Sequence, residues 1–158
     1  MEGYRRTRVV FVCLGNACRS PMAEAVALRD AADVMESSSA GLTPLGRVEP
    51  MTRQTLAANG FASDKLISKP ILPASLDEAD IVVNMSGMPK ELAFQDHTKV
   101  EDWYVEDPYG ADTDLYQRIF EDIERRVTEL AERLRNAGSS RKLTGNIKGK
   151  GTGGRRRQ

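Results

Sequence analysis

The chain has 158 residues, of which 40% are hydrophobic and 29% are charged, and its formal net charge is zero. This composition indicates one globular domain with a core of its own. It excludes a membrane-spanning helix, because no apolar run approaches the roughly 20 residues that a span needs. The first residues also lack the apolar stretch and cleavage site of a secretion signal, so we expect a cytoplasmic protein.

The balanced charge hides an uneven distribution along the chain. From Gly138 onward the sequence has seven basic residues and no acidic one, which leaves 16 basic and 23 acidic residues before it. Residues 138–158 are also rich in Gly and Ser, so we expect a folded domain over residues 5–137 followed by a flexible basic tail. A tail of this charge suits acidic partners. Because it has no aromatic side chains to stack on bases, it does not indicate specific nucleic-acid binding.

A strand, a loop and a helix are predicted at the beginning of the chain. Residues 7–13 form a short β-branched run that is followed by a Gly-Asn turn signal, which predicts a buried parallel strand. Ser20 suits the N-cap of a helix, and Pro21 suits its first position. The helix is expected from Met22 to about Ala32, and the three elements together begin a βαβ unit.

The middle of the chain continues this alternation of strands and helices. Gly60 suits the end of one helix, and two prolines indicate an irregular segment. The expected elements are the end of a strand at 38–42, a helix at 51–59, the irregular segment at 69–73, a strand at 81–85, a short helix at 89–94 and a strand at 100–105.

The last helix has the clearest periodicity in the chain. Asp112 or Thr113 can cap its start, and Gly138 is expected to end it. Apolar residues recur at spacings of three or four, which predicts one buried face. They are Leu115, Ile119, Ile123, Val127, Leu130 and Leu134.

Strands that alternate with helices predict an α/β fold with a parallel sheet covered on both faces. With four strands, the expected arrangement is a flavodoxin-like three-layer sandwich. Ligands in such sheets bind at the carboxyl ends of the strands. Cys13 lies at the end of the first predicted strand, so the loop after it is the candidate site.

The loop between this strand and the first helix has the features of an anion site. Backbone N–H groups and the positive end of the helix dipole converge there. Gly15 is expected to allow a tight turn, and Asn16 tolerates a left-handed conformation. Arg19 adds a planar fork that matches two phosphate oxygens.

Cys13 is the candidate nucleophile of this site. The helix dipole and Arg19 both favour the thiolate, and Ser20 can donate a hydrogen bond to it. A thiolate that faces a bound phosphate can attack the phosphorus in line. A buried, inert cysteine would also suit the end of a strand. The surrounding glycine, asparagine, arginine and serine favour the catalytic interpretation.

The sequence predicts neither a metal site nor a cofactor. Its two cysteines, Cys13 and Cys18, lie in one short loop, and its single histidine, His97, lies in a polar stretch. These residues provide no cluster of metal ligands, and cysteines so close together do not indicate a structural disulfide.

The segment from Val12 to Glu24 closely resembles the signature of the low-molecular-weight protein tyrosine phosphatases. Ser39-Ala40-Gly41 is similar to the short segment after the second strand of that family, and Asp107-Pro108-Tyr109 resembles its acid loop. The resemblance extends from about Arg8 to Leu134. It implies the same three-layer fold and a metal-independent phosphatase that forms a cysteinyl-phosphate intermediate.

The resemblance also implies a role for individual residues. Cys13 is the nucleophile, Arg19 clamps the phosphate, and Asp107 is the general acid and base. Cys18 takes a position that can form a reversible disulfide with the nucleophile under oxidants. The residues expected to bind substrate are Leu14, Gly15, Asn16, Ala17, Cys18, Ser20 and Tyr109.

The sequence departs from the family pattern at three places. The family often has a histidine before the third strand, where this chain has Leu66-Ile67-Ser68-Lys69-Pro70. Many members have Met-Asp after that strand, and this chain has Met85-Ser86. Ala17 is smaller than the apolar residue of tyrosine-directed relatives, and it is not the threonine of arginine phosphatases.

These departures leave the substrate open. The leading interpretation is a phosphatase for protein phosphotyrosine or small aryl phosphates. The first alternative is a protein arginine phosphatase. A further alternative is an arsenate reductase that uses an external thiol, since no cysteine follows Cys18 to relay a disulfide.

Overall fold

The computed structural model describes residues 5–157, with side chains described as far as Gly138. Its centre is one parallel sheet in the order β2-β1-β3-β4. The strands are β1 (Thr7–Cys13), β2 (Met35–Gly41), β3 (Ile81–Asn84) and β4 (Val100–Asp102).

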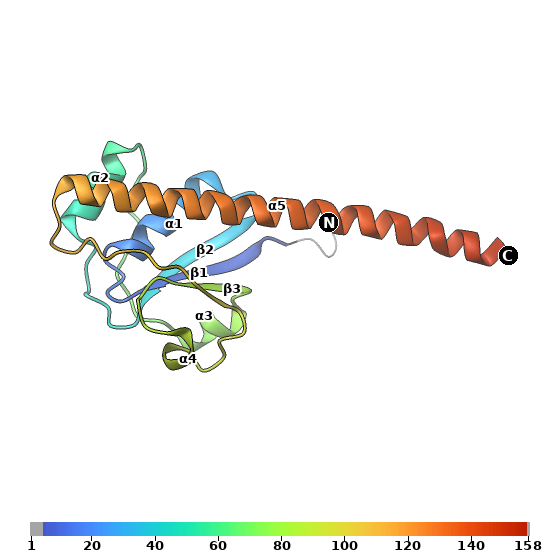
Figure 1. Cartoon of the computed structure of the whole chain (residues 1–158), viewed down its shortest axis with the longest axis horizontal. Coiled ribbons are helices and arrows are strands. Elements are labelled where there is room, and N and C mark those ends of the chain that lie inside the picture. The colour runs from blue at the N-terminus through green and yellow to red at the C-terminus, as the bar shows by residue number, and fades with distance from the viewer. Residues whose placement is uncertain (1–4, 158) are drawn as a thin grey trace.

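Helices cover both faces of this sheet (Figure 1). The helices on one face are α1 (Arg19–Asp30), α2 (Pro50–Ala58) and α5 (Thr113–Arg157), and those on the other are α3 (Pro73–Glu78) and α4 (Lys90–Ala93). This arrangement confirms the predicted α/β three-layer sandwich with four parallel strands. Within the part of the chain that is described, no helix is long and apolar enough to cross a membrane.

The side chains of β1 explain why its sequence is almost continuously hydrophobic. Val9, Phe11 and Cys13 pack into the core under α1, α2 and α5. Val10 and Val12 point to the opposite face and pack with the residues around α3 and α4. Because successive side chains of a strand alternate between its faces, a strand covered on both faces needs apolar residues at every position.

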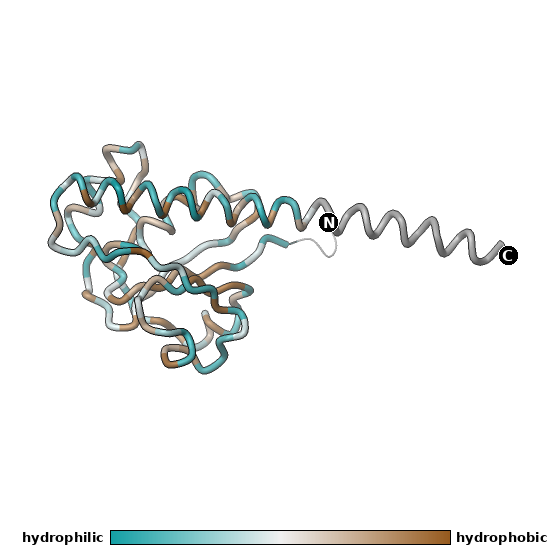
Figure 2. Tube along the Cα trace, in the orientation of Figure 1, coloured by the Kyte–Doolittle hydropathy of each residue, from teal (hydrophilic) through white to brown (hydrophobic). Residues whose placement is uncertain are grey.

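Helix α5 buries the predicted stripe, and Figure 2 shows hydrophobic residues recurring along it among hydrophilic ones. Asp112 is the cap, because its Oδ1 accepts the N–H of Leu115 at 2.9 Å. Tyr116 and Phe120 are also buried, which the spacing did not predict. The buried residues of the predicted stripe are Ile119, Ile123, Val127 and Leu130, while Leu115 and Leu134 are partly buried.

Helix α5 does not end at Gly138, as the sequence predicts, but continues to Arg157. A glycine inside a helix costs about 1 kcal/mol relative to alanine but removes no backbone hydrogen bond, so it does not by itself end a helix. The side chains of the basic tail after Gly138 lie outside the described residues. Its flexibility and its acidic partners stay predictions.

Other local predictions differ from the structure in instructive ways. Helix α1 begins at Arg19, and Ser20 is not its cap, because the hydroxyl of Ser20 contacts Cys13 instead. Helix α3 was not predicted, since it is six residues long and buries none of them. The last strand was expected to reach Val105, but it ends at Asp102. The next residue, Trp103, makes the last hydrogen bond to β3, from its N–H to the Asn84 carbonyl.

Candidate active site

The topology places Cys13 at the main crevice of the sheet. The chain leaves β1 for β2 on one side and then crosses to β3 on the other, so the connections diverge beside the carboxyl end of β1. Such switch points are where open parallel sheets bind ligands. Cys13 is the last residue of β1, and its side chain is buried.

The loop after Cys13 turns its carbonyl groups away from the crevice. Four of these carbonyls accept hydrogen bonds from the backbone N–H groups of residues 42–49. A peptide unit is planar, with its C=O and N–H pointing in opposite directions, so a carbonyl held outward aims the next N–H inward. The bonds are Cys13 to Leu42 (3.1 Å), Leu14 to Thr43 (2.8 Å), Gly15 to Leu45 (2.9 Å) and Ala17 to Glu49 (3.1 Å).

The inward N–H groups have no protein acceptor. Among the described residues, none of the backbone N–H groups of residues 14–19 donates a hydrogen bond. Backbone N–H groups that face one crevice beside a helix N-terminus form a site for an anion.

Asn16 organises the polar contacts behind this loop. It is fully buried and has a left-handed φ of 49°, as predicted. Its Oδ1 accepts the backbone N–H of Lys69 at 2.9 Å, which fixes the orientation of the amide. Its Nδ2 therefore donates to Ser20 Oγ at 2.7 Å and to Ser39 Oγ at 3.0 Å. Ser39 in turn donates to the Glu24 carboxylate.

This orientation decides how Ser20 interacts with Cys13. Because Ser20 Oγ accepts from Asn16, its own proton is available to Cys13 Sγ, which lies 3.0 Å away. The backbone N–H of Ser20 donates to the same sulfur at 3.4 Å. Two donors thus converge on Cys13 Sγ, and both stabilise a negative charge there.

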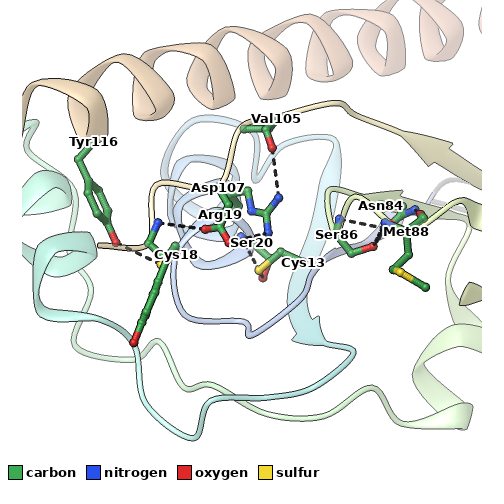
Figure 3. Close-up of polar contacts among 11 residues, drawn as sticks. Cys13, Cys18, Arg19, Ser20, Asn84, Ser86, Met88, Val105, Asp107 and Tyr116 are labelled. Carbon is green, nitrogen blue, oxygen red and sulfur yellow. Dashed lines mark hydrogen bonds and ion pairs between the residues drawn. The ribbon is translucent and has the colours of Figure 1, made fainter. Parts of the chain in front are cut away.

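Arg19 lies beside the sulfur with its guanidinium only partly used (Figure 3). Its side chain is 6% exposed; Nη1 donates to the Val105 carbonyl at 3.1 Å, and Nη2 lies 3.4 Å from Asp107 Oδ2. Its Nε is buried and has no partner among the described residues. A buried charged donor normally has an acceptor, so Nε is a further donor for an anion at this site.

Asp107 and Tyr109 lie at the mouth of the crevice. The Asp107 side chain is 47% exposed, and its Oδ1 accepts the N–H of Tyr109 at 3.1 Å. Both residues line a pocket of about 300 Å³. The complete lining is Cys13, Leu14, Gly15, Ala17, Cys18, Arg19, Thr43, Leu45, Asp107 and Tyr109.

Most of the residues predicted from the sequence therefore meet in one pocket. Asn16 and Ser20 do not line it but lie buried behind it. Thr43 and Leu45 were missed, because nothing local in the sequence links the loop after β2 to the loop after β1. The one sequence feature that pointed to this region was the family-like segment Ser39-Ala40-Gly41, which leads into the loop after β2.

Gly15 does not have the special backbone conformation expected of it, and the site depends on a different glycine, Gly41. The φ of Gly15 is not left-handed, and a Cβ added to it would come no closer than 3.7 Å to Leu45 Cβ. A Cβ on Gly41 would lie 2.9 Å from the backbone N of Asn16. Gly41 is therefore the glycine that the close approach of the loop requires.

Cys18 has surroundings that differ from those of Cys13. Its sulfur accepts the hydroxyl of Tyr116 at 3.1 Å, and both cysteines are free thiols. Burial raises the pKa of the Cys18 thiol, against the hydrogen bonds from Tyr116 and Thr52, which lower it. The reversible disulfide of Cys18 with Cys13 under oxidants stays a prediction.

The two departures near β3 have different consequences. Ser68 Oγ donates to the Gly15 carbonyl at 2.9 Å, so the segment without a histidine still contacts the loop. The turn after β3 closes on itself, because Ser86 Oγ donates to Asn84 Oδ1 at 2.7 Å (Figure 3). Within residues 5–157, no three His, Cys, Asp or Glu side chains gather as metal ligands would.

Comparisons with known proteins agree on the family and divide on activity. A protein-arginine-phosphatase of Bacillus subtilis is 28% identical over 80% of this chain and 96% of its own length. A glutaredoxin arsenate reductase of Synechocystis is 30% identical over 80% and 98%. The structure of a low molecular weight protein tyrosine phosphatase from T. tengcongensis aligns with a TM-score of 0.75 at 27% identity, covering 81% of this chain and 99% of that one.

The family model described as low molecular weight phosphotyrosine protein phosphatase matches residues 8–140. The match spans both the loop after β1 and the segment that carries Asp107, the two parts of the chain that meet in the pocket. This chain therefore belongs to the low molecular weight phosphotyrosine protein phosphatase family.

Proposed function

We propose that this protein is a cysteine-dependent phosphatase whose catalytic residues are Cys13, Arg19 and Asp107, in a catalytic domain over residues 5–137. The observation that carries the proposal is the set of unpaired donors around Cys13 Sγ: the inward N–H groups of residues 14–19 and the buried Nε of Arg19. Together they match the equatorial oxygens of a phosphoryl group under attack by the sulfur.

In the first step the Cys13 thiolate attacks the phosphorus in line. The bond from phosphorus to the ester oxygen breaks, and Asp107 gives its proton to the departing oxygen. The dianionic phosphate takes over the fork of Arg19 and so releases the Asp107 carboxyl from its ion pair. The product is a cysteinyl-phosphate and a neutral alcohol or phenol.

In the second step Asp107 acts as a base. Its carboxylate takes a proton from a water molecule, whose oxygen attacks the phosphorus while the bond from sulfur to phosphorus breaks. The thiolate returns with its two donors from Ser20, and inorganic phosphate leaves. These donors lower the cost of expelling the sulfur, because they stabilise it as an anion.

Phosphotyrosine or another aryl phosphate is the substrate that the pocket suits best. Its walls include the apolar side chains of Leu14, Ala17 and Leu45, with the Tyr109 ring exposed at the mouth. An aromatic leaving group can bury its faces against them, whereas a guanidinium would leave its donors facing mainly hydrocarbon. The one carboxylate that lines the pocket, Asp107, is needed for proton transfer.

A protein arginine phosphatase is the second candidate, because a relative with that name covers most of this chain. An arsenate reductase with an external thiol is a third, and the reductase among the relatives favours it. Turnover of matched phosphotyrosine and phosphoarginine peptides separates the first two. Arsenate-dependent consumption of a reduced thiol would establish the third.

Hydrolysis of an aryl phosphate by the wild type and two variants tests the proposal. Cys13→Ser is expected to abolish turnover, and Asp107→Asn is expected to slow it while leaving phosphate binding intact. Full activity of Cys13→Ser would overturn the mechanism. A strong preference for phosphoarginine would overturn the substrate assignment and leave the mechanism standing.

A further inference from the structure

Ser68 connects the loop after β1 with the loop after β2. It is buried, and it lies on the irregular segment between α2 and α3. Its Oγ lies 2.9 Å from the Gly15 carbonyl and 3.0 Å from the backbone N of Gly46. A backbone N–H can only donate, so the hydroxyl accepts from Gly46 and its single proton goes to Gly15.

The contact with Gly15 controls a donor of the phosphate cradle. The Gly15 carbonyl and the Asn16 N–H belong to one planar peptide unit and point in opposite directions. The Leu45 N–H and the Ser68 hydroxyl both donate to this carbonyl at 2.9 Å, and by holding it outward together they aim the Asn16 N–H into the crevice. The next residue, Lys69, holds the side chain of Asn16 through its own N–H at 2.9 Å. Two successive residues therefore hold Asn16 from its backbone and from its side chain.

The segment that carries Ser68 is itself anchored on both sides. Arg53 of α2 donates to the Leu66 carbonyl at 3.2 Å and to the Ser63 carbonyl. The backbone N–H of Gly41, at the end of β2, donates to the Lys69 carbonyl at 2.9 Å. With its neighbours fixed, the Ser68 hydroxyl acts from a rigid support rather than from a free loop.

We propose that Ser68 is a positioning residue that sets the Asn16 N–H for phosphate and ties Gly46, the residue after the pocket-lining Leu45, to the same peptide unit. The inference rests on the proposed phosphatase function, since it concerns the phosphate cradle of that site. It explains how the chain organises its loop without the histidine that many relatives carry. Ser68 touches no substrate, so its effect appears first in phosphate binding.

The direct test is the dissociation constant of inorganic phosphate, measured by calorimetry on the full chain. Ser68→Ala removes the hydroxyl, and the constant is expected to rise about 3- to 10-fold, as for one lost hydrogen bond. The Michaelis constant for an aryl phosphate should rise by a similar factor, with a smaller change in kcat. Ser68→Thr keeps a hydroxyl and is expected to restore binding to within about twofold.

Ser37→Ala is the matched control. Ser37 lies on β2, and its buried Oγ has no partner among the described residues, so the same atoms are removed without a lost hydrogen bond. Its phosphate binding should equal that of the wild type. An unchanged constant in Ser68→Ala, or a Ser68→Thr variant as weak as Ser68→Ala, would overturn the inference. A wild type that binds no phosphate would instead overturn the proposed function.

A second measurement needs no variant, and it keeps the inference testable if Ser68→Ala does not fold, because it tests whether the Asn16 N–H faces the bound phosphate. Phosphate is titrated into ¹⁵N-labelled wild type, and the backbone amide resonances of the loop are followed. The Asn16 amide is expected to be among those that shift most, since its N–H faces the anion. An Asn16 amide that stays in place while other loop amides shift would contradict the inference.

Discussion

Replacing Gly41 by alanine tests how closely the loop after β1 packs on the end of β2. The added Cβ would lie 2.9 Å from the backbone N of Asn16 and 3.0 Å from the carbonyl carbon of Gly15. Both neighbours are backbone atoms with no side-chain torsion that could relieve the contact. The loop must move by several tenths of an ångström, and overpacking of this kind costs about 1–3 kcal/mol in free energy of unfolding.

Gly15→Ala is the matched control, because it adds the same atoms to the other side of the same contact. Its nearest neighbour would be Leu45 Cβ at 3.7 Å, which is an ordinary contact. Urea unfolding measures the difference in free energy of unfolding between the two variants. In thermal unfolding, each kcal/mol of that difference should lower Tm by about 2–4 °C for a chain of this size. We expect Gly41→Ala to be clearly less stable than Gly15→Ala and to bind phosphate more weakly. If Gly15→Ala were the more damaging change, the packing argument would be wrong.

Three further predictions concern the proton donor, the second cysteine and the start of the sheet. Asp107→Asn should lower kcat/KM about 100-fold or more for substrates with poor leaving groups and much less for activated aryl phosphates, and equal losses of kcat/KM for both would contradict its role as acid. Iodoacetate at neutral pH should modify Cys13 and spare Cys18, whose pKa burial raises, and phosphate should protect Cys13; peptide mass spectrometry measures both sites. The hydrogen bond from Arg5 lowers the pKa of Asp80, so the carboxylate stabilises the fold above its unfolded pKa of about 3.9 and loses this effect as pH falls through the lower folded value. Urea unfolding should therefore show Asp80→Asn less stable than wild type at neutral pH and equal to it in strong acid, and a constant difference would refute this.

Local signals in the sequence were sufficient for the centre of the fold and for the chemistry of the loop. The β-branched run of β1, the turn residues after it and the spacing of α5 each depend on neighbours within a few positions. The same signals gave the candidate residues Cys13 and Arg19, since the strand, loop and helix that position them are contiguous in the chain.

The rest of the site depends on contacts between distant segments. Ser68 contacts Gly15 across 53 residues of sequence, and Leu45 contacts it across about 30. No local pattern in the sequence predicts that these residues lie together. Ser20 was expected to cap α1 by a sound local rule, but its hydroxyl serves Cys13 and Asn16 instead. The need for glycine at position 41 could not be predicted, because it arises only when the folded backbone brings the loop after β1 against the end of β2.

The most direct test of the proposed mechanism is a search for the phosphoryl group on Cys13 during turnover. Asp107→Asn should slow the hydrolysis of the intermediate, so the variant is mixed with an aryl phosphate, quenched and digested, and its peptides are analysed by mass spectrometry. We predict a phosphoryl group on the peptide that contains Cys13, attached to that sulfur, and none in Cys13→Ala/Asp107→Asn at the same position under the same conditions. Turnover by the wild type with no phosphorylated Cys13 in any quenched sample would contradict the mechanism.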